Sequence, residues 1–240
     1  MKAFILNSGL GKRMGDLTRK HPKCMTELVD NETILSRQLK QLQICGINDV
    51  VMTTGLYDKV LIEYCNTLNL QMKITFVNNP IYDKTNYIYS VYLAKEHIYD
   101  NDVIFMHGDL VFEMDVLKDM IQNNYSCMAI SSLFPLPTKD FKAVINNRNL
   151  IEKIGIDFFD NAVAAQPLYK IQKQDWNIWL NQIAFYCENG QVSCYAENAF
   201  NEISNKCHIY PMDYKEQLCA EIDTPEDLMI IRDRLDYICN

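Results

Sequence analysis

The stretch AFILNSGLGKRMGDLTRKHPKCM, residues 3–25, decides the fold expected for this chain. Its first four residues are apolar and predict a short buried strand, which is followed by two glycines, Gly9 and Gly11. Glycine permits positive φ and lets backbone N–H groups approach an anion closely. Five basic residues follow within Lys12–Lys23, against the single acid Asp16. Because the turn combines accessible backbone with positive charge, it favours a binding site for a polyphosphate.

The composition narrows the class of protein. The sequence has 240 residues, 48% hydrophobic and 22% charged, which is typical of a soluble globular protein with a full core. Lys and Arg number 23 and Asp and Glu 31, so the formal net charge of −8 argues against nucleic acid and anionic membranes as partners. The apolar run Ala3–Leu6 is too short for a signal peptide, and no run approaches the roughly 20 residues that span a bilayer. We therefore expect a cytoplasmic protein.

The cysteine and histidine residues carry no metal-binding pattern. The nine cysteines include no C-x-x-C, and the closest pair is Cys187 and Cys194. They predict buried apolar side chains in a reducing compartment. The four histidines lack zinc-ligand spacing.

Short apolar runs alternate with helical patterns through the first half of the chain. Strands are predicted at residues 3–8, 49–55, 73–78 and 102–112, and helices at residues 32–45, 57–68 and 85–99. Alternation at this spacing indicates βαβ units and a mainly parallel sheet with both faces covered. The sequence therefore predicts the α/β class.

The pattern is looser after residue 126. Strands are predicted at residues 127–133, 141–146 and 164–171, and helices at residues 176–188 and 197–205. A last helix is expected to begin at Pro225 with Thr224 as its N-cap. We expect one domain whose second half adds strands and a lid over the edge of the sheet.

The glycines alone leave an ordinary strand–helix turn and an NAD site open. A dinucleotide turn G-x-G-x-x-G would need glycine where Met14 stands, and the phosphate loop G-x-x-x-x-G-K-[ST] does not occur. The basic residues make both alternatives less favoured, because dinucleotide turns do not need Arg and Lys inside the loop. In an open parallel sheet, ligands collect at the carboxyl ends of the strands, where this turn is expected.

At this point the chain resembles the nucleotidyltransferases, which transfer a nucleoside monophosphate from a nucleoside triphosphate. The family opens with an apolar strand followed by G-x-G-x-R, L-T and P-K, matched by Gly9, Gly11, Arg13, Leu17, Thr18, Pro22 and Lys23. The resemblance continues through CGINDVVMTTG (residues 45–55), NPIYDKTNYIYSVYLAKE (79–96), HGDLVF (107–112) and AEIDTPEDL (220–228). It covers the chain end to end and is weakest between residues 133 and 209.

Within the family, TNYIYSVYLAKE (residues 85–96) is similar to small cytidylyltransferases that act on phosphocholine, aminoethylphosphonate and related metabolites. The segment NSGLGKRM (residues 7–14) resembles most closely the corresponding segment of cytidylyltransferases that act on phosphoglutamine. The resemblance implies a single Rossmann-like, GT-A-type domain over residues 1–240, with a mainly parallel sheet flanked by helices and an added β-rich acceptor-side lid. Residues 1–125 would form the nucleotide-binding half and residues 126–240 the acceptor-side half.

The implied reaction is attack of an acceptor phosphate oxygen on the α-phosphorus of the triphosphate, with pyrophosphate leaving. Two anions must meet, so the site must neutralise their charge and align them. Arg13 suits the β- and γ-phosphates through its planar guanidinium group, and Lys23 is expected at the α-phosphate or the attacking phosphate. These two are the expected catalytic residues.

Mg²⁺ is the expected cofactor, because hard oxygen ligands serve it. Asp109 follows the apolar run 103–108 at the end of a predicted strand, where a carboxylate has no packing role. The resemblance places Asp223 beside the same metal, although this acid could instead favour the dipole of the helix that follows.

The remaining site residues are expected from residue type and position. The nucleotide is expected to contact Leu6, Asn7, Ser8, Gly9, Gly11, Lys12, Asn79, Thr85 and Asn86. Asn86 could equally cap the following helix. The acceptor is expected to contact Lys142, Tyr169, Lys170, Glu197 and Glu221, whereas Trp176 and Trp179 are expected to pack in the core. The chain departs from the family pattern at Asn7–Ser8 and at Asp16.

We therefore expect a Mg²⁺-dependent transfer of CMP from CTP to a small phosphorylated, amine-bearing metabolite. L-glutamine phosphate, as used in capsule phosphoramidate synthesis, is the acceptor favoured; phosphocholine, aminoethylphosphonate and a sugar phosphate are alternatives, and a homodimer is left open. A GT-A glycosyltransferase usually carries D-x-D, but Val111 stands at the second acidic position. A catalytically inactive regulatory relative would have lost Arg13, Lys23 or Asp109, and all three are present.

Overall fold

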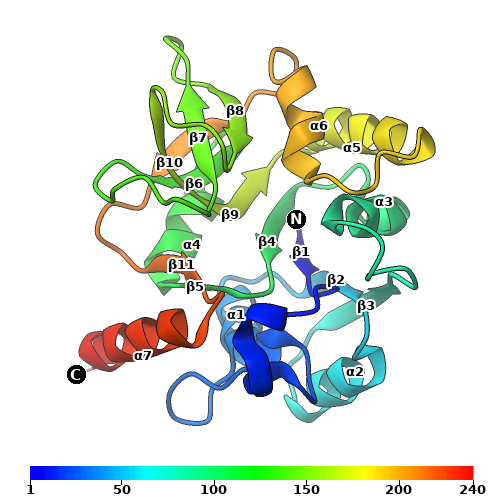
Figure 1. Cartoon of the computed structure of the whole chain (residues 1–240), viewed down its shortest axis with the longest axis vertical. Helices are drawn as coiled ribbons and strands as arrows, with labels where there is room; N and C mark the ends of the chain where they lie inside the picture. The colour runs from blue at the N-terminus through cyan, green and yellow to red at the C-terminus, as the bar shows by residue number, and fades with distance from the viewer. Residues whose placement is uncertain (240) are drawn as a thin grey trace.

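The computed structural model describes residues 1–239 and is built around one large sheet (Figure 1). The strand order is β10-β6-β9-β4-β1-β2-β3, with β7 and β8 attached beside β9. Four adjacent strands are parallel: β1 (Lys2–Leu6), β2 (Asp49–Thr54), β3 (Lys73–Asn78) and β4 (Val103–His107). The α/β class with a mainly parallel sheet is therefore confirmed.

The second half of the chain adds strands of mixed direction. β9 (Ala162–Ile171) pairs antiparallel with β4 on one side and with β6 (Cys127–Ser131) on the other. The other added strands are β7 (Lys142–Ile145), β8 (Ile151–Gly155) and β10 (Tyr210–Asp213). These strands form the β-rich addition expected beside the parallel sheet.

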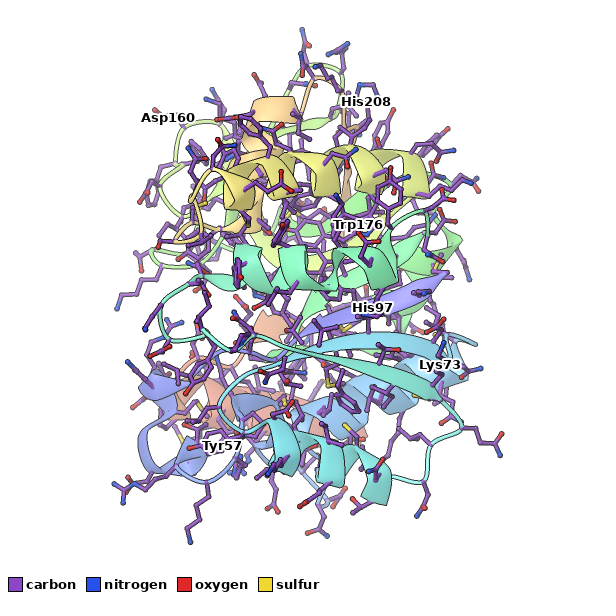
Figure 2. The ribbon with its side chains drawn as sticks, turned by 90° about the vertical axis from the view of Figure 1, so that its right-hand side faces the viewer. Tyr57, Lys73, His97, Asp160, Trp176 and His208 are labelled. Carbon is purple, nitrogen blue, oxygen red and sulfur yellow. The ribbon has the colours of Figure 1, made fainter. Side chains whose placement is uncertain are left out.

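Helices cover both faces of the sheet. One face carries α3 (Tyr87–Ile98), α5 (Lys173–Glu188) and α6 (Ala196–Ile203), whose apolar side chains share one core cluster. Figure 2 shows α5 and α3 above the strands and α2 below them, with His97 on α3 and Trp176 on α5. The other face carries α1 (Ile34–Ile44), α2 (Asp58–Thr67) and α4 (Met114–Gln122), which share a second cluster.

The buried aromatic and sulfur-bearing side chains belong to these clusters. Trp176 and Trp179 are fully buried, and Trp179 Nε1 donates a hydrogen bond to the Ala196 carbonyl oxygen at 2.8 Å, so their expected packing role is confirmed. All eight cysteines among residues 1–239 whose side chains are described are free thiols, and six of them are buried.

The predicted strand at residues 102–112 is divided. It ends as β4 at His107 and resumes as β5 (Leu110–Phe112), which pairs antiparallel with β11 (Cys219–Glu221) in a separate two-stranded sheet. The break lies at Gly108, where the Gly108 N–H donates to the Leu6 carbonyl oxygen at 3.0 Å and the chain turns out of the main sheet. The sequence analysis did not predict α4, β8, β10 or β11.

Pairing of β5 with β11 brings two distant acids to one edge. The Ile222 N–H donates to the Asp109 carbonyl oxygen at 3.0 Å, so Asp223 follows directly beside Asp109. The next helix, α7 (Pro225–Cys239), begins as predicted: Thr224 Oγ1 accepts a hydrogen bond from the Asp227 N–H at 3.2 Å. The Asp227 carboxylate in turn accepts from the Asp223 N–H at 3.0 Å, which fixes the backbone that carries Asp223.

Within residues 1–239, no helix combines the length and the apolar character needed to cross a membrane.

We predict that Gly108→Ala is strongly destabilising, whereas Gly9→Ala is tolerated by the fold. A Cβ at Gly108 would lie 1.7 Å from Asn7 Oδ1 and 2.8 Å from the Leu6 carbonyl oxygen, whereas a Cβ at Gly9 meets nothing within 4 Å. Overpacking against backbone should lower the free energy of unfolding by about 2 kcal/mol or more, against less than about 0.5 kcal/mol for the control. Urea unfolding measures both. Equal stability of the two variants would contradict the close approach.

Candidate functional site

A cavity of about 360 Å³ lies where the loop after β1 meets the ends of β4 and β11. We name it the glycine-loop cavity. Nine residues selected from the sequence line it: Leu6, Asn7, Gly9, Gly11, Lys12, Arg13, Lys23, Asp109 and Asp223. The structure therefore brings the predicted catalytic pair, the predicted metal pair and most of the predicted nucleotide contacts to one place.

The loop is shaped by one left-handed glycine. Gly11 has φ +60°, and the Thr18 hydroxyl donates to its carbonyl oxygen at 3.0 Å. A Cβ at Gly11 would also lie 3.2 Å from the Lys23 Cβ. The matching residues of G-x-G, L-T and P-K thus pack against one another, and this packing carries Lys23 into the cavity.

Four charged side chains form an ion-pair cluster: Arg13, Lys23, Asp109 and Asp223. The Lys23 ammonium donates to Asp109 Oδ2 at 2.5 Å and to Asp223 Oδ1 at 2.6 Å. Arg13 Nη2 lies 2.8 Å from the same oxygen of Asp223. The Lys23 side chain is only 13% exposed and that of Arg13 is 62% exposed, so Lys23 is the enclosed member and Arg13 reaches in from the rim.

Lys23 and Asp109 each favour the charged form of the other. Burial alone would lower the pKa of Lys23, but Asp109 and Asp223 outweigh it and raise that pKa above its ordinary value. Burial alone would raise the pKa of Asp109, but the Lys23 ammonium outweighs it and lowers that pKa. Each group therefore keeps its partner charged.

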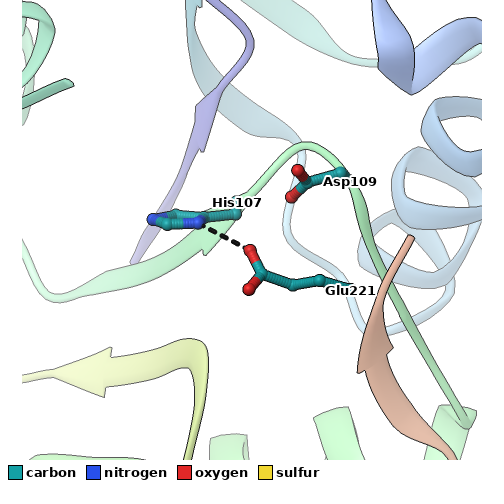
Figure 3. A group of neighbouring side chains, drawn as sticks. All are labelled: His107, Asp109 and Glu221. Carbon is teal, nitrogen blue, oxygen red and sulfur yellow. Dashed lines mark hydrogen bonds and ion pairs between the residues drawn. The ribbon is translucent and has the colours of Figure 1, made fainter. Parts of the chain in front are cut away.

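A third acid, the partly buried Glu221, lies close to Asp109. His107 Nδ1 lies 2.9 Å from Glu221 Oε1, and ligand atoms of His107, Asp109 and Glu221 all lie within 4.8 Å of one another (Figure 3). Burial and the Asp109 carboxylate raise the pKa of Glu221 to about 7. Burial would lower the pKa of His107, but its hydrogen bond with Glu221 raises it on balance.

The side chains around Asp109 fit a divalent cation. Asp109 Oδ1 is buried and has no hydrogen-bond partner among the described residues, so one carboxylate oxygen is left for a ligand. Oxygen atoms of Asp109, Asp223 and Glu221 are the hard ligands that Mg²⁺ prefers, whereas the imidazole of His107 is not. A cation at this position would lie between the glycine-loop cavity and the aromatic cavity, which is defined below.

A polar cavity of about 470 Å³ extends from Ser8 to the start of α3. It includes the predicted residues Asn79, Thr85 and Asn86, and we name it the asparagine cavity. The Asn79 amide donates to the hydroxyl oxygens of Thr85 at 3.1 Å and Ser90 at 3.0 Å. Asn86 Oδ1 accepts from the Tyr87 N–H at 2.7 Å, so Asn86 does cap α3 while it lines the cavity.

A third cavity, of about 200 Å³, lies beyond Asp109 and is lined by three aromatic rings, Tyr87, Phe141 and Tyr195. We name it the aromatic cavity. The ring centroids of Tyr87 and Tyr195 are 5.6 Å apart, and those of Phe141 and Tyr195 are 5.4 Å apart. Its polar lining is Arg13, His107, Asp109, Lys139, Asp140, Glu221 and Asp223. It shares Arg13, Asp109 and Asp223 with the glycine-loop cavity, so a molecule in one can reach a molecule in the other.

Three of the predicted acceptor residues lie behind the aromatic cavity rather than in its lining. Glu197 is buried and accepts hydrogen bonds from the hydroxyl groups of Tyr87 and Tyr169, the latter at 2.8 Å. Lys142 is also buried and donates to the carbonyl oxygens of Pro137 at 2.6 Å and Asp140 at 3.0 Å. These contacts hold Tyr87 and the segment that carries Asp140.

The other two predicted acceptor residues are placed differently from each other. Glu221 lines the aromatic cavity. Lys170 pairs in register with Ile104, near the beginning of β4, and its ammonium donates to the Asn123 carbonyl oxygen. Because Asp109 follows the other end of β4, Lys170 lies toward the opposite edge of the sheet, and this placement does not support an acceptor contact.

Several lining residues were outside the predicted set. Gly108 lines the glycine-loop cavity, Ser193 the asparagine cavity, and Asp140 the aromatic cavity. A small residue before the strand-end acid in HGD could have indicated Gly108. Ser193 carries no such signal, because its position depends on the Asn86 N–H donating to the Val192 carbonyl oxygen at 2.8 Å.

The chain is similar to several known proteins. The chain is 28% identical over 169 residues to the CTP:phosphoglutamine cytidylyltransferase of Campylobacter jejuni, a match covering 65% of each chain. The chain thus spans about two thirds of that relative's length. It is 25% identical over 233 residues to the choline-phosphate cytidylyltransferase of Streptococcus pneumoniae, with 95% of each covered.

The fold is shared with a solved structure. The CTP:phosphocholine cytidylyltransferase of Streptococcus pneumoniae superimposes with a TM-score of 0.78 at 21% identity, over 98% of both chains. The family model described as nucleotidyl transferase matches residues 2–143, more than half of the chain and all of the glycine loop, Lys23 and Asp109. The chain belongs to the nucleotidyl transferase family.

Proposed function

We propose that this protein is a Mg²⁺-dependent cytidylyltransferase that transfers CMP from CTP to a small phosphorylated metabolite bearing an amine, with release of pyrophosphate. The observation that carries the proposal is the convergence of Arg13 and Lys23 with Asp109 and Asp223 behind the glycine turn. Cations for phosphate and carboxylates for a metal are the two requirements of nucleotidyl transfer. The two cytidylyltransferase relatives support CTP as the donor.

The three cavities suggest where each part of the substrates lies. The triphosphate would occupy the glycine-loop cavity, where Asn7 Nδ2 is buried and has no hydrogen-bond partner among the described residues. The nucleoside would extend into the asparagine cavity, whose amide and hydroxyl groups suit a pyrimidine edge. The acceptor would enter through the aromatic cavity, which meets the other two at Asp109 and Tyr87.

The chemistry assigned to the protein is charge neutralisation and alignment. Lys23 would hold the α-phosphate and the attacking phosphate oxygen close together, and Arg13 would hold the leaving pyrophosphate. Asp109 and Asp223 would hold Mg²⁺, which supplies further positive charge against the phosphates when bound. A bond forms between the acceptor oxygen and the α-phosphorus, and the bond from that phosphorus to the bridging oxygen of the leaving pyrophosphate breaks. No side chain needs to be a nucleophile.

The lining of the aromatic cavity favours an amino-acid acceptor such as L-glutamine phosphate. Asp140 and Glu221 offer carboxylates for an α-ammonium group, and Lys139 offers a cation for an α-carboxylate. Phosphocholine is the second candidate, because Tyr87, Phe141 and Tyr195 present rings to a quaternary ammonium group. Phosphocholine has no carboxylate for Lys139.

Pyrophosphate release separates these candidates. With Mg²⁺ present, we expect release with CTP well above that with ATP, GTP or UTP, and L-glutamine phosphate to be preferred over phosphocholine and aminoethylphosphonate. Lys139→Met should raise KM for L-glutamine phosphate but not for phosphocholine. No release with CTP and any of these acceptors would contradict the proposed function.

Lys23→Met should lower kcat by about 100-fold or more, since it removes the enclosed cation that meets the developing charge. Lys118→Met is the matched control, because the Lys118 ammonium pairs with Asp115 at 2.8 Å on the exposed surface of α4. Steady-state pyrophosphate assays compare the two variants. Similar kcat values for both would show that Lys23 takes no part in the reaction.

Glu197→Gln should raise KM for the acceptor by about 10-fold and leave KM for CTP nearly unchanged. The carboxylate accepts from Tyr87 and Tyr169, whereas an amide has one acceptor oxygen and would release one hydroxyl. Glu202→Gln on the same helix is the control, because Glu202 is exposed, accepts from the Gln182 amide and lies outside the lining of the aromatic cavity. An equal rise in both KM values would place Glu197 outside acceptor binding.

A further inference from the structure

The Lys23 ammonium occupies the position between the carboxylates of Asp109 and Asp223. It donates to one oxygen of each, at 2.5 and 2.6 Å. A divalent cation held by the same two carboxylates would need these oxygens. Lys23 and the cation therefore compete for one position, because two positive charges cannot share the same pair of oxygens at contact distance without strong repulsion.

The same ion pairs oppose the binding of phosphate. Lys12, Arg13 and Lys23 line the glycine-loop cavity, and Arg13 and Lys23 are both paired with Asp223 in the structure. A polyphosphate that takes Lys23 must break its two contacts with the carboxylates. Once Lys23 has moved, the carboxylate oxygens are uncompensated, and a divalent cation can bind without breaking those contacts again.

We infer that Lys23 excludes the divalent cation from the carboxylates until a polyphosphate draws it away, so that the protein binds the two ligands with positive coupling. The disruption of the Lys23 ion pairs is a cost common to both ligands. Whichever binds first meets this cost, and the second binds more tightly. The inference rests on the proposed function only in that the glycine-loop cavity takes a polyphosphate; it does not depend on the base or the acceptor.

Such coupling has a chemical consequence for an enzyme that holds two anions. With its ion pairs closed, the ligand-free site presents no free Lys23 ammonium, and this ammonium engages one oxygen each of Asp109 and Asp223. Free metal ions and inorganic phosphate would each bind weakly on their own, because each must open the cluster without help. When a polyphosphate and its metal ion bind together, a single rearrangement of the ion-pair cluster serves both ligands.

Direct metal binding without nucleotide tests the first half of the inference. Mn²⁺, followed by the loss of its free-ion electron paramagnetic resonance signal, is titrated into the full chain and into Lys23→Met. We expect Lys23→Met to bind Mn²⁺ at least 10-fold more tightly than the unmodified chain.

Lys12→Met is the matched control for the Mn²⁺ titration. It removes the same charge from the lining of the same cavity, and Lys12 forms no ion pair recorded among the described residues. The affinity of Lys12→Met for Mn²⁺ should exceed that of the unmodified chain by less than about 3-fold. Equal affinity of Lys23→Met and the unmodified chain, or an equal gain in Lys12→Met, would overturn the inference.

Metal-free binding of the anion tests the second half of the inference, that the ion pairs oppose the binding of phosphate. This test does not require Lys23→Met to fold. Tripolyphosphate and CTP are titrated by calorimetry in the presence of a chelator. Asp223→Asn should bind both several-fold more tightly than the unmodified chain, because it releases Arg13 and removes one of the two carboxylates that hold Lys23. Asp140→Asn, which removes a carboxylate from the aromatic cavity, should gain less.

The two anions also separate this inference from the proposed function. A gain with tripolyphosphate but no binding of CTP would leave the coupling in place and overturn the choice of nucleotide. No gain with either anion in Asp223→Asn would overturn the coupling, whatever the pyrophosphate assays show.

Discussion

The close approach of β1 and β4 at their carboxyl ends is the constraint on which the site depends. Gly108 donates its N–H to the Leu6 carbonyl oxygen, and there is no room for a Cβ beside Asn7. The chain therefore leaves the main sheet at this point, and Asp109 begins the short segment that pairs with β11. That pairing sets Asp223 beside Asp109 although 114 residues separate them in the sequence. The capping box of α7 then holds the backbone of Asp223 in place.

Part of the positive charge behind the glycine turn is balanced locally by carboxylates. Lys23 is enclosed between two carboxylates, and Arg13 joins them from the rim, whereas Lys12 is exposed. An acidic protein can thus keep a phosphate site ready without presenting a strong positive field at its surface. An anion that binds Lys23 and Arg13 must draw them away from these carboxylates. Glu221 and His107 extend the same network to the aromatic cavity.

Periodicity predicted the parallel part of the fold well, because β1, β2, β3 and the helices between them are long apolar patterns with clear ends. It failed for β8, which has two exposed residues in a row, and for β11, which has only three residues. The glycine loop, Lys23 and Asp109 could be selected because their chemistry is local in sequence. Lys142, Tyr169, Lys170 and Glu197 were selected by residue type, and type alone does not say which end of β9 a side chain lies near or which carbonyl it meets. Lys170 lies beside the beginning of β4, and Glu197 accepts from two tyrosines behind the cavity wall.

The antiparallel strand β9 has a consequence for how such a protein can diversify. It joins the two halves through a ladder with β4 that involves the four residues Val103–Met106 and ends two residues before Gly108. The segments that line the acceptor side, residues 139–141, 156 and 193–195, are loops or helix entrances attached beyond that ladder. Substitutions and insertions there can alter which metabolite is accepted without shifting the phosphate-binding loop. Such a division would let the segments of the second half diverge while the phosphate-binding loop is kept.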